Sequence, residues 1–494
     1  MRFTLIIFSY TIYDLTTTLR NIVYFISAII IASCSQVEKK QSQEDNIVFD
    51  VVILGGRVMD PETGIDATKN VGILDGTIRV ISDSLIEGKE VIHASGLVVA
   101  PGFIDTDNYA ANAELQVADG VTTVLNLRKG TNNVDNWYDE HFNKMLINYG
   151  VGISYHDIRE QVMGEHGRLQ IHRKEPTDDQ FKKILNRLSK EFDNGAVALG
   201  MGGSGGYDPA GWELIEIFKV AAEEKAHVVA TLRDDLWDES NITANLLQMI
   251  GTASLSGAHI HIPHIGSSAG PHMSRFLEVL AYARANGISI TAEDYPYSAA
   301  EIDVKKGELY TMTDEEIHQV QPMDSDSRLT RETIGMYGEK NFEAYYHNDG
   351  IEPFIIEGIR APFVQIASHG SNLKWTEKGI GHPRTAGTYS RVLGKYVREK
   401  SVISLMEALR KMTLLPAELL SARVPTMQKK GRIQVGADAD IVVFDSVKVI
   451  DRATFTKQIP STGIEYVLVN GIIVVKQGSI QKGIFPGNAI RSKL

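Results

Sequence analysis

The sequence predicts an α/β fold in which a (β/α)8 TIM-like barrel is inserted in a small composite β domain formed by both ends of the chain. Three observations predict it. The middle of the chain, residues 101–420, alternates short apolar strands with amphipathic helices, which is typical of a parallel sheet. The strands of this part number eight, as a barrel requires. Dense β-like segments occur at both ends of the chain, before and after the alternating part.

Composition sets the outer limits of the interpretation. The 494 residues allow two to four domains, or one large barrel with an appendage. Lys and Arg total 50 and Asp and Glu total 62, so the net charge is −12, which disfavours nucleic acid as a partner. The single cysteine excludes an intrachain disulfide and a cysteine-rich zinc cluster.

That cysteine, Cys34, follows Ile22–Ser33, an almost wholly apolar run that Arg20 precedes. The run is shorter than the ~20 residues that cross a bilayer but has the length of a signal-peptide core. Residues 31–34, Ile-Ala-Ser-Cys, resemble a bacterial lipoprotein signal, which implies lipidation of Cys34 and anchoring to a membrane of the cell envelope. An uncleaved anchor helix is the alternative. Residues 35–46 are polar and are expected to form a solvated tether.

The β domain is expected to combine residues 47–100 with residues 421–485. Turn signals separate its strands, and Asn470-Gly471 is a strong hairpin signal. Two separate small β units are the alternative. The expected strands are Phe49–Leu54, Val71–Leu74, Ile78–Ile81, Val91–Ala94, Ile441–Phe444, Tyr466–Val469 and Ile472–Val475.

The barrel is expected within residues 101–420. Residues 301–360 are polar and interrupt the alternation of strands and helices, which indicates a long insertion able to act as a lid over the barrel mouth. The expected barrel strands are Val98–Ile104, Thr122–Leu127, Gly152–Tyr155, Ala196–Leu199, Val228–Thr231, His259–Pro263, Ile288–Ala292 and Val364–Ser368. The expected helices include Asp178–Phe192, Trp212–Glu223, Met273–Ala285 and Leu405–Lys411.

An ordered set of short motifs runs from residue 49 to residue 480. It begins with Val-Ala-Pro-Gly-Phe-Ile-Asp at 99–105 and ends with Gly-Ala-Asp-Ala-Asp-Ile-Val at 436–442. Between them lie Gly-Val-Thr-Thr at 120–123, Ile-His-Ile-Pro-His at 260–264, Asp-Tyr-Pro-Tyr at 294–297, Gly-His-Pro-Arg at 381–384, Gly-Thr-Tyr at 387–389 and Leu-Leu-Pro-Ala at 414–417. The set resembles the amidohydrolase superfamily, in its N-acyl-D-amino-acid deacylase (D-aminoacylase-like) branch.

The resemblance implies hydrolysis of a linear C–N amide bond by a divalent metal, usually zinc, at the carboxyl end of the barrel. Most of the family's ligand positions are substituted here. The first-strand His-x-His falls on Asp107 and Tyr109, and the second-strand ligand falls in 126–129, Asn-Leu-Arg-Lys. The fifth-strand His falls on Thr231, the eighth-strand Asp falls on His369, and His264 on the sixth strand is retained.

These substitutions leave two hypotheses open. In the first hypothesis, the chain has lost the metal site and with it the catalytic activity. The protein is then a pseudoenzyme that binds ligands or acts as a scaffold. Alternatively, strands one and eight are neighbours and have exchanged ligand types, so that Asp107, His264 and His369 form a two-His, one-carboxylate metal site with Asp107 and His369 as catalytic residues. The second hypothesis requires these side chains to converge, and it requires Arg128 and Lys129 to point away or be neutralised. Contact between Lys129 and Asp107 would exclude it.

Substrate-binding residues also follow from the resemblance. Arg384 would bind the α-carboxylate of an N-acyl amino acid or a related small carboxylate, with Tyr295 and Tyr297 assisting. A structural ion pair for Arg384 and simple packing for the tyrosines are the alternatives. We expect His261 to point away from His264, because the two are three residues apart on a strand.

Overall fold

The computed structural model describes residues 48–108, 113–164, 175–202, 211–232, 239–370 and 381–492. Cys34 and the tether therefore lie outside the described residues, as does Tyr109. Within the described ranges, no helix combines the length and the apolar character needed to cross a membrane.

Eight parallel strands form the barrel, in chain order around it. The first and last strands are joined beyond their ends, where Asn108 forms a parallel bridge with Gly370. This bridge makes the barrel nearly closed, as predicted, and it brings the chain after the first strand beside the chain after the eighth. The strands are β6 (Phe103–Asp105), β7 (Val121–Thr131), β8 (Asn148–Ser154), β9 (Ala198–Met201), β10 (His227–Ala230), β11 (His259–Ile262), β12 (Ile290–Asp294) and β16 (Val364–Ile366).

The strand expected over Val98–Ile104 is two strands. Its first half, β5 (Val98–Pro101), pairs with the β domain, and only β6 enters the barrel. The break falls at Gly102, where a β-carbon would lie 2.1 Å from a methyl carbon of Thr122. A glycine is therefore required where the chain passes from one sheet to the other.

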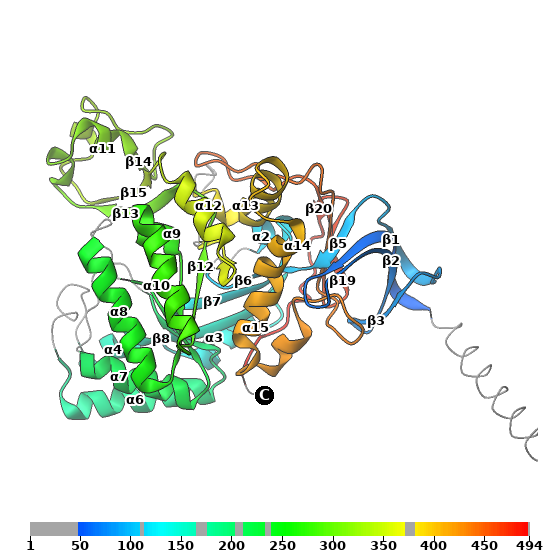
Figure 1. Ribbon diagram of the computed structural model, residues 1–494, viewed down its shortest axis with the longest axis horizontal. Helices are drawn as coiled ribbons and strands as arrows, with labels where there is room; N and C mark the ends of the chain where they lie inside the picture. Colours follow the sequence, from blue (N-terminus) through cyan, green and yellow to red (C-terminus); the bar gives the residue numbers. More distant parts are fainter. Residues whose placement is uncertain are drawn as a thin grey trace, which may run out of the picture.

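The helices pack on the outside of the barrel, where their apolar faces meet the strands (Figure 1). Helices α6 and α10 begin where the sequence predicts, and the capping box of Thr177 and Gln180 fixes the start of α6. The helices in this part are α2 (Glu114–Ala118), α3 (Val134–His141), α4 (Tyr155–Met163), α6 (Asp178–Asp193), α7 (Gly211–Glu223), α8 (Glu239–Ser256), α9 (Ile265–Ala269), α10 (Met273–Ala285) and α12 (Glu352–Arg360). After the eighth strand come α13 (Arg384–Arg391), α14 (Leu405–Leu409) and α15 (Leu415–Ser421), with π-helical turns at Val392–Glu399 and Arg410–Leu414.

The segment after the seventh strand builds a small unit of its own. Strands β13 (Ala299–Val304), β14 (Val320–Pro322) and β15 (Phe342–His347) form an antiparallel sheet, with α11 (Asp314–Gln319) beside it. This unit projects beyond α9 and α10 at the upper left of Figure 1. Its own apolar cluster stabilises it: Val304, Leu309, Ile317, Val320, Leu329, Ile334 and Ala344.

Both ends of the described chain contribute to one nine-stranded sheet, which confirms the composite β domain. Strand β17 from the end pairs with β5 from the beginning, so the two groups of strands are continuous. Asn470 and Gly471 have φ of 49° and 79°, as the hairpin signal predicts. The strands are β1 (Phe49–Asp60), β2 (Ile65–Leu74), β3 (Thr77–Ser82), β4 (Gly88–His93), β5, β17 (Ile441–Phe444), β18 (Ile464–Val469), β19 (Ile472–Lys476) and β20 (Ser479–Ile480).

A buried polar network joins this sheet to the barrel. The ammonium of Lys430 lies 2.6 Å from Asp440 and 2.9 Å from Asp438. Asp440 also accepts hydrogen bonds from the side chain of Asn148 at the start of β8 and from the backbone of Asn470. One carboxylate therefore fixes the two units relative to each other.

Candidate active site

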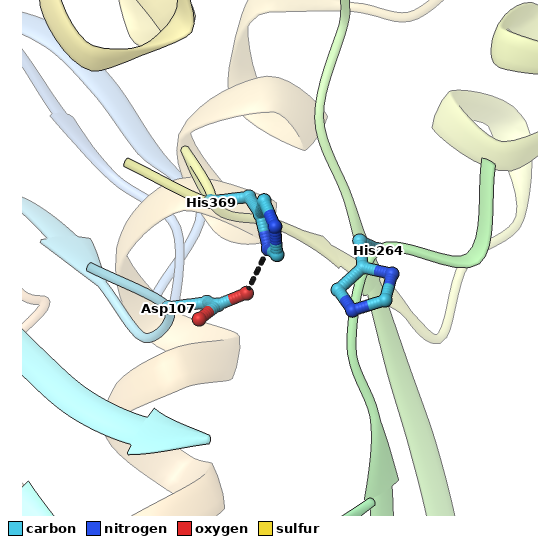
Figure 2. Close-up of side chains that lie close together, drawn as sticks. All are labelled: Asp107, His264 and His369. Atoms are coloured by element: carbon cyan, nitrogen blue, oxygen red, sulfur yellow. Dashed lines mark hydrogen bonds and ion pairs between the residues drawn. The ribbon is translucent and has the colours of Figure 1, made fainter. Parts of the chain in front are cut away.

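Three side chains that the sequence singles out meet at the carboxyl end of the barrel. Asp107 follows β6, His264 follows β11 and His369 follows β16. One ligand atom from each lies within 4.8 Å of the others, and this convergence is the one that the exchanged-ligand hypothesis requires. In Figure 2 the carboxylate of Asp107 and the ring of His369 are joined directly, and the ring of His264 lies beside them.

Asp107 is buried, and both His369 and Arg128 contact its carboxylate. His369 Nδ1 lies 2.5 Å from one of its carboxylate oxygens. Nε of Arg128 lies 3.0 and 3.2 Å from its two oxygens. The rings of His264 and His369 meet edge to face with centroids 4.5 Å apart. The carboxylate therefore balances a guanidinium and orients an imidazole at the same time.

The arrangement sets the protonation states of the cluster. Burial by itself raises the pKa of Asp107, but the adjacent charges of Arg128 and His369 outweigh it and hold the pKa well below its usual range. Burial lowers the pKa of His369 to about 4, against the opposing attraction of Asp107. Burial and the nearby cations hold the pKa of His264 well below its usual value. At neutral pH the cluster is thus one carboxylate with two neutral imidazoles.

The loop after β11 fixes His264 in an uncommon conformation. Its φ is 40°, in the left-handed region that non-glycine residues rarely adopt. Ser267 donates to its backbone carbonyl and contacts its Nδ1 at 3.0 Å, and Asp294 accepts a hydrogen bond from the backbone N–H of Gly266. These contacts hold Nδ1 toward Ser267, so the other ring nitrogen, Nε2, is the one that serves the cluster.

Arg384 also reaches this site, from the first residue of α13. Its side chain is 1% exposed, and its guanidinium carbon lies 5.0 Å from the centre of the Tyr295 ring. Nη2 is 3.0 Å from a carboxylate oxygen of Glu301, but within the described part of the chain neither Nε nor Nη2 makes a well-directed hydrogen bond. A buried guanidinium with unsatisfied donors is the group that a planar carboxylate ligand would complete.

The two tyrosines differ in their surroundings. The Tyr295 ring stacks on His369 with centroids 5.8 Å apart, so it forms a wall of the site. The Tyr297 hydroxyl instead donates to Asp451, and Arg391 lies over its ring. Both rings line a small pocket beside His264 whose other walls include apolar residues near the insertion: Tyr346, Ile351 and Ile355.

The structure also places the remaining residues that the sequence singled out. The prediction that His261 points away from His264 is consistent with its contact to Glu293, 2.9 Å away in the barrel interior. Thr231 contacts His264 at 3.5 Å, and Lys129 is exposed. Arg128 pairs with Asp107, so the expectation that Arg128 points away from the site is wrong, and the acidic group that neutralises it is one of the expected metal ligands.

Two contributors were not predicted from the sequence. Glu301 comes from the insertion, and no motif connects it to Arg384 across more than eighty residues of chain. Asp294 could have been found, because it is the last residue of a barrel strand and begins the Asp-Tyr-Pro-Tyr motif. Burial raises its pKa to about 7. A second group of potential ligands, His156, Asp157 and Glu160, lies half-buried on α4.

Comparison with known proteins decides between possible families. Residues 376–475 match the model of the amidohydrolase family. N-acyl-D-glutamate deacylase of Alcaligenes xylosoxydans xylosoxydans is 26% identical over 481 residues, covering 87% of this chain and 94% of the relative. D-aminoacylase of the same organism is 25% identical over 485 residues, covering 87% of this chain and 95% of the relative.

The chain carries a segment that matches the amidohydrolase family, and it resembles the D-aminoacylase-like branch of that family. The fold agrees with this assignment: N-acyl-D-glutamate deacylase from Bordetella bronchiseptica, solved with zinc and a phosphonate inhibitor, superposes with a TM-score of 0.77. The match covers 90% of this chain and 100% of that one, at 23% identity.

The residues present can hold a divalent ion of the kind found in that zinc complex. Two imidazoles and a carboxylate are a common ligand set for divalent metals. Ligand atoms at ~2.0–2.2 Å from one ion lie at most ~4.4 Å apart, and the three here lie within 4.8 Å of one another, so they would have to move slightly closer together to share an ion. Because Arg128 shares the carboxylate of Asp107, the set suits one ion with open positions.

Proposed function

We propose that this amidohydrolase-family protein hydrolyses the amide C–N bond of an N-acyl amino acid or a related small carboxylate. The observation that carries the proposal is Arg384, whose buried guanidinium has unsatisfied donors next to the cluster of Asp107, His264 and His369. A free carboxylate would replace Glu301 as its partner. The named activities of the N-acyl-D-glutamate deacylase and D-aminoacylase relatives support the choice of substrate class.

The chain's own residues supply orientation and a proton acceptor. Arg384 would fix the carboxylate, and the Tyr295 ring would limit the position of the amide beside His369. If His369 donates Nδ1–H to Asp107, its Nε2 keeps one lone pair, which can accept a proton from an attacking water when no ion is bound to it. The carboxylate of Asp107 would stabilise the imidazolium that results. An ion bound at Nε2 would use that lone pair and would itself activate the water.

A divalent ion such as zinc, held by Asp107, His264 and His369, would polarise the amide carbonyl and lower the pKa of the attacking water. We expect slower turnover than a site with the family's full ligand set allows, since by the resemblance the second-strand ligand falls in residues 126–129, Asn-Leu-Arg-Lys, and the fifth-strand ligand falls on Thr231. Arg128 already balances part of the charge of Asp107 that would otherwise serve the ion.

The second candidate function is ligand binding without hydrolysis. The observation that favours it is that Arg128 pairs with the carboxylate of Asp107, which places a positive charge next to the position that a divalent ion would take. The same pocket would then bind the carboxylate and release it unchanged.

One experiment separates the two functions. Purified protein, with its metal content measured, is incubated with N-acetyl-D- and N-acetyl-L-amino acids with and without added zinc, and released amine is quantified. Amine release that Asp107→Asn abolishes supports hydrolysis. Binding of the same compounds by calorimetry without release supports the binding function, and absence of both overturns the substrate class.

A further inference from the structure

Beneath the site, a file of polar side chains runs through the interior of the barrel. Successive residues of a strand point to opposite faces, so His259 and His261 of β11 face the same side, as do Thr291 and Glu293 of β12. The file begins at the exposed Ser289, just before β12, and passes through half-buried His259 and Thr291. It ends at His261 and Glu293, which are 0% and 1% exposed.

Each member lies within hydrogen-bond distance of the next. Ser289 Oγ is 2.6 Å from His259 Nδ1, and His259 Nε2 is 2.9 Å from Thr291 Oγ1. Thr291 Oγ1 is 2.8 Å from His261 Nδ1, and His261 Nε2 is 2.9 Å from Glu293 Oε2. No step in the file exceeds the range of an ordinary hydrogen bond.

The carboxylate at the end orients every proton in the file. An ionised Glu293 only accepts, so His261 donates its Nε2–H and must accept at Nδ1 from the hydroxyl of Thr291. Thr291 has then used its one proton, so His259 donates Nε2–H to it and accepts at Nδ1 from Ser289. All four hydrogen bonds therefore point from the solvent toward Glu293.

The inner end of the file lies below the site. Thr106, which directly precedes Asp107, donates to the same Glu293 oxygen that His261 contacts. The other oxygen, Oε1, is buried and has no hydrogen-bond partner in the described part of the chain. Burial raises the pKa of Glu293, and the negative charge of Asp107 raises it further. The carboxylate of Asp107 is therefore close enough to Glu293 to affect its protonation. A purely structural network would be expected to satisfy both oxygens.

We propose that this file is a proton relay between the solvent at the amino-terminal end of the barrel and the floor of the site. One proton enters from water at Ser289, each hydroxyl or imidazole passes its own proton to the next member, and Glu293 becomes a neutral acid. When Glu293 then gives its proton to water at the floor of the site, one proton has entered the file and one has left it, and Glu293 is again a carboxylate. Rotation of the hydroxyls and imidazoles restores the starting hydrogen bonds, so the Nε2–H of His261 is replaced by a proton from solvent. The relay exists whether or not the site hydrolyses an amide; its use in turnover rests on the proposed function.

The relay can be measured without any assay of activity. In uniformly ¹⁵N-labelled protein, the His261 ring signal is identified by its absence in His261→Gln, and the exchange of its Nε2–H with D2O is followed by NMR. We expect the neutral Nε2–H tautomer, and exchange faster than that of the buried backbone amides of Ile260 and Ile262. Exchange of all three at one common rate would show that solvent reaches His261 by opening of the barrel, and would overturn the relay.

Two variants of one residue sharpen the test. Thr291→Val keeps the shape of the side chain but interrupts the file, and it should slow exchange at His261 about tenfold or more. Thr291→Ser keeps the hydroxyl and should retain the wild-type rate. Thr122→Val is the matched control, because it removes a buried barrel hydroxyl that lies outside the file and has no hydrogen-bond partner among the described residues. Equal rates in the Val and Ser variants contradict the proposal.

A second readout applies if the proposed hydrolysis is found. Thr291→Val should then lower kcat and leave KM unchanged, while Thr122→Val should alter neither. Unchanged kcat together with slowed exchange would show that the relay exists but that the reaction takes its protons from the mouth of the barrel. That outcome retains the relay and overturns its use in turnover.

Discussion

His264 and His369 share the left-handed backbone conformation, with φ of 40° and 51°, at the ends of two barrel strands that flank a third. A side chain with a β-carbon costs ~1–3 kcal/mol in such sparsely populated regions, and residues in them concentrate at functional sites. Both rings are thereby directed to the carboxylate of Asp107. This end of the barrel therefore combines a strained backbone, a convergent cluster of side chains and the buried Arg384. The predictions that follow test whether it is a functional site.

The first prediction concerns the guanidinium on Asp107. Arg128→Gln should increase the affinity of the cluster of Asp107, His264 and His369 for zinc at least tenfold, because it removes a positive charge next to the ion. Isothermal titration calorimetry with zinc measures this. Lys129→Gln removes the same charge from the adjacent exposed residue and should leave the affinity nearly unchanged. Equal effects of the two variants would contradict a direct role of Arg128.

A second prediction concerns recognition of the carboxylate. A bound N-acyl amino acid should raise the melting temperature in proportion to the logarithm of its concentration above Kd, and Arg384→Ala should abolish this shift. Arg391→Ala is the matched control, because Arg391 lies on the same helix but pairs with Asp451. If Arg384→Ala instead prevents folding, the arginine is a structural ion pair with Glu301.

The pH dependence of stability follows from Asp119. Burial raises the pKa of Asp119 to about 7, although it accepts hydrogen bonds from Tyr389, Ser390 and Ser461. The folded state therefore keeps this proton to higher pH than the unfolded state, whose carboxyl titrates near ~4. The contribution of Asp119 to stability is thus greatest below pH ~4 and falls as the pH rises to ~7, by at most about 4 kcal/mol.

Asp119→Asn should remove that part of the pH dependence. The difference in unfolding free energy between wild type and variant, measured by urea denaturation, should shift in favour of the variant as the pH rises from 4 to 8. A difference that stays constant over this range would show that the carboxyl of Asp119 is already ionised in the folded state.

A fourth prediction concerns the joint between the barrel and the sheet. Lys430→Met removes the buried ammonium that pairs with buried Asp440 and half-buried Asp438, and it should cost about 3–5 kcal/mol. Chemical denaturation of wild type and variant gives this value. Lys429→Met, at the exposed neighbouring position, should change the stability by less than about 0.5 kcal/mol.

The N-terminal segment supplies a fifth prediction. We propose that Cys34 is lipidated and anchors the protein in the bacterial envelope. Wild type should fractionate with membranes, and Cys34→Ser should be released or remain unprocessed, as seen in membrane fractionation and intact-protein mass spectrometry. Wild-type protein found wholly in the soluble fraction would overturn the proposal.

Much of the fold could be predicted because its signals are local. Each barrel strand is a short apolar run, and α10 lies at the predicted bounds, Met273–Ala285. The split of Val98–Ile104 was missed because both halves are apolar, and pairing partners from distant parts of the chain separate them at Gly102. The insertion lacked a pattern of its own, so its three-stranded sheet was not predicted.

The site, like the fold, was predicted where the signal is local or follows from the barrel, and missed where distant segments meet. The meeting of Asp107 with His369 follows from the closure of a barrel, in which the first and eighth strands are neighbours. Which of Arg128 and Lys129 would reach Asp107 depended on the side of β7 to which each residue points, and the motif did not determine it. The ion pair of Arg384 with Glu301 joins segments that no sequence pattern relates.

The pairing of β17 with β5 also has a consequence for biosynthesis. Strands β1 to β5 leave the ribosome early, but the open edge of β5 must wait for a partner that lies more than 330 residues later. Barrel strands made meanwhile can pair in order, whereas the N-terminal strands keep an exposed edge that invites pairing with other chains. Chaperones that protect unfinished chains should therefore engage the N-terminal strands until synthesis is almost complete.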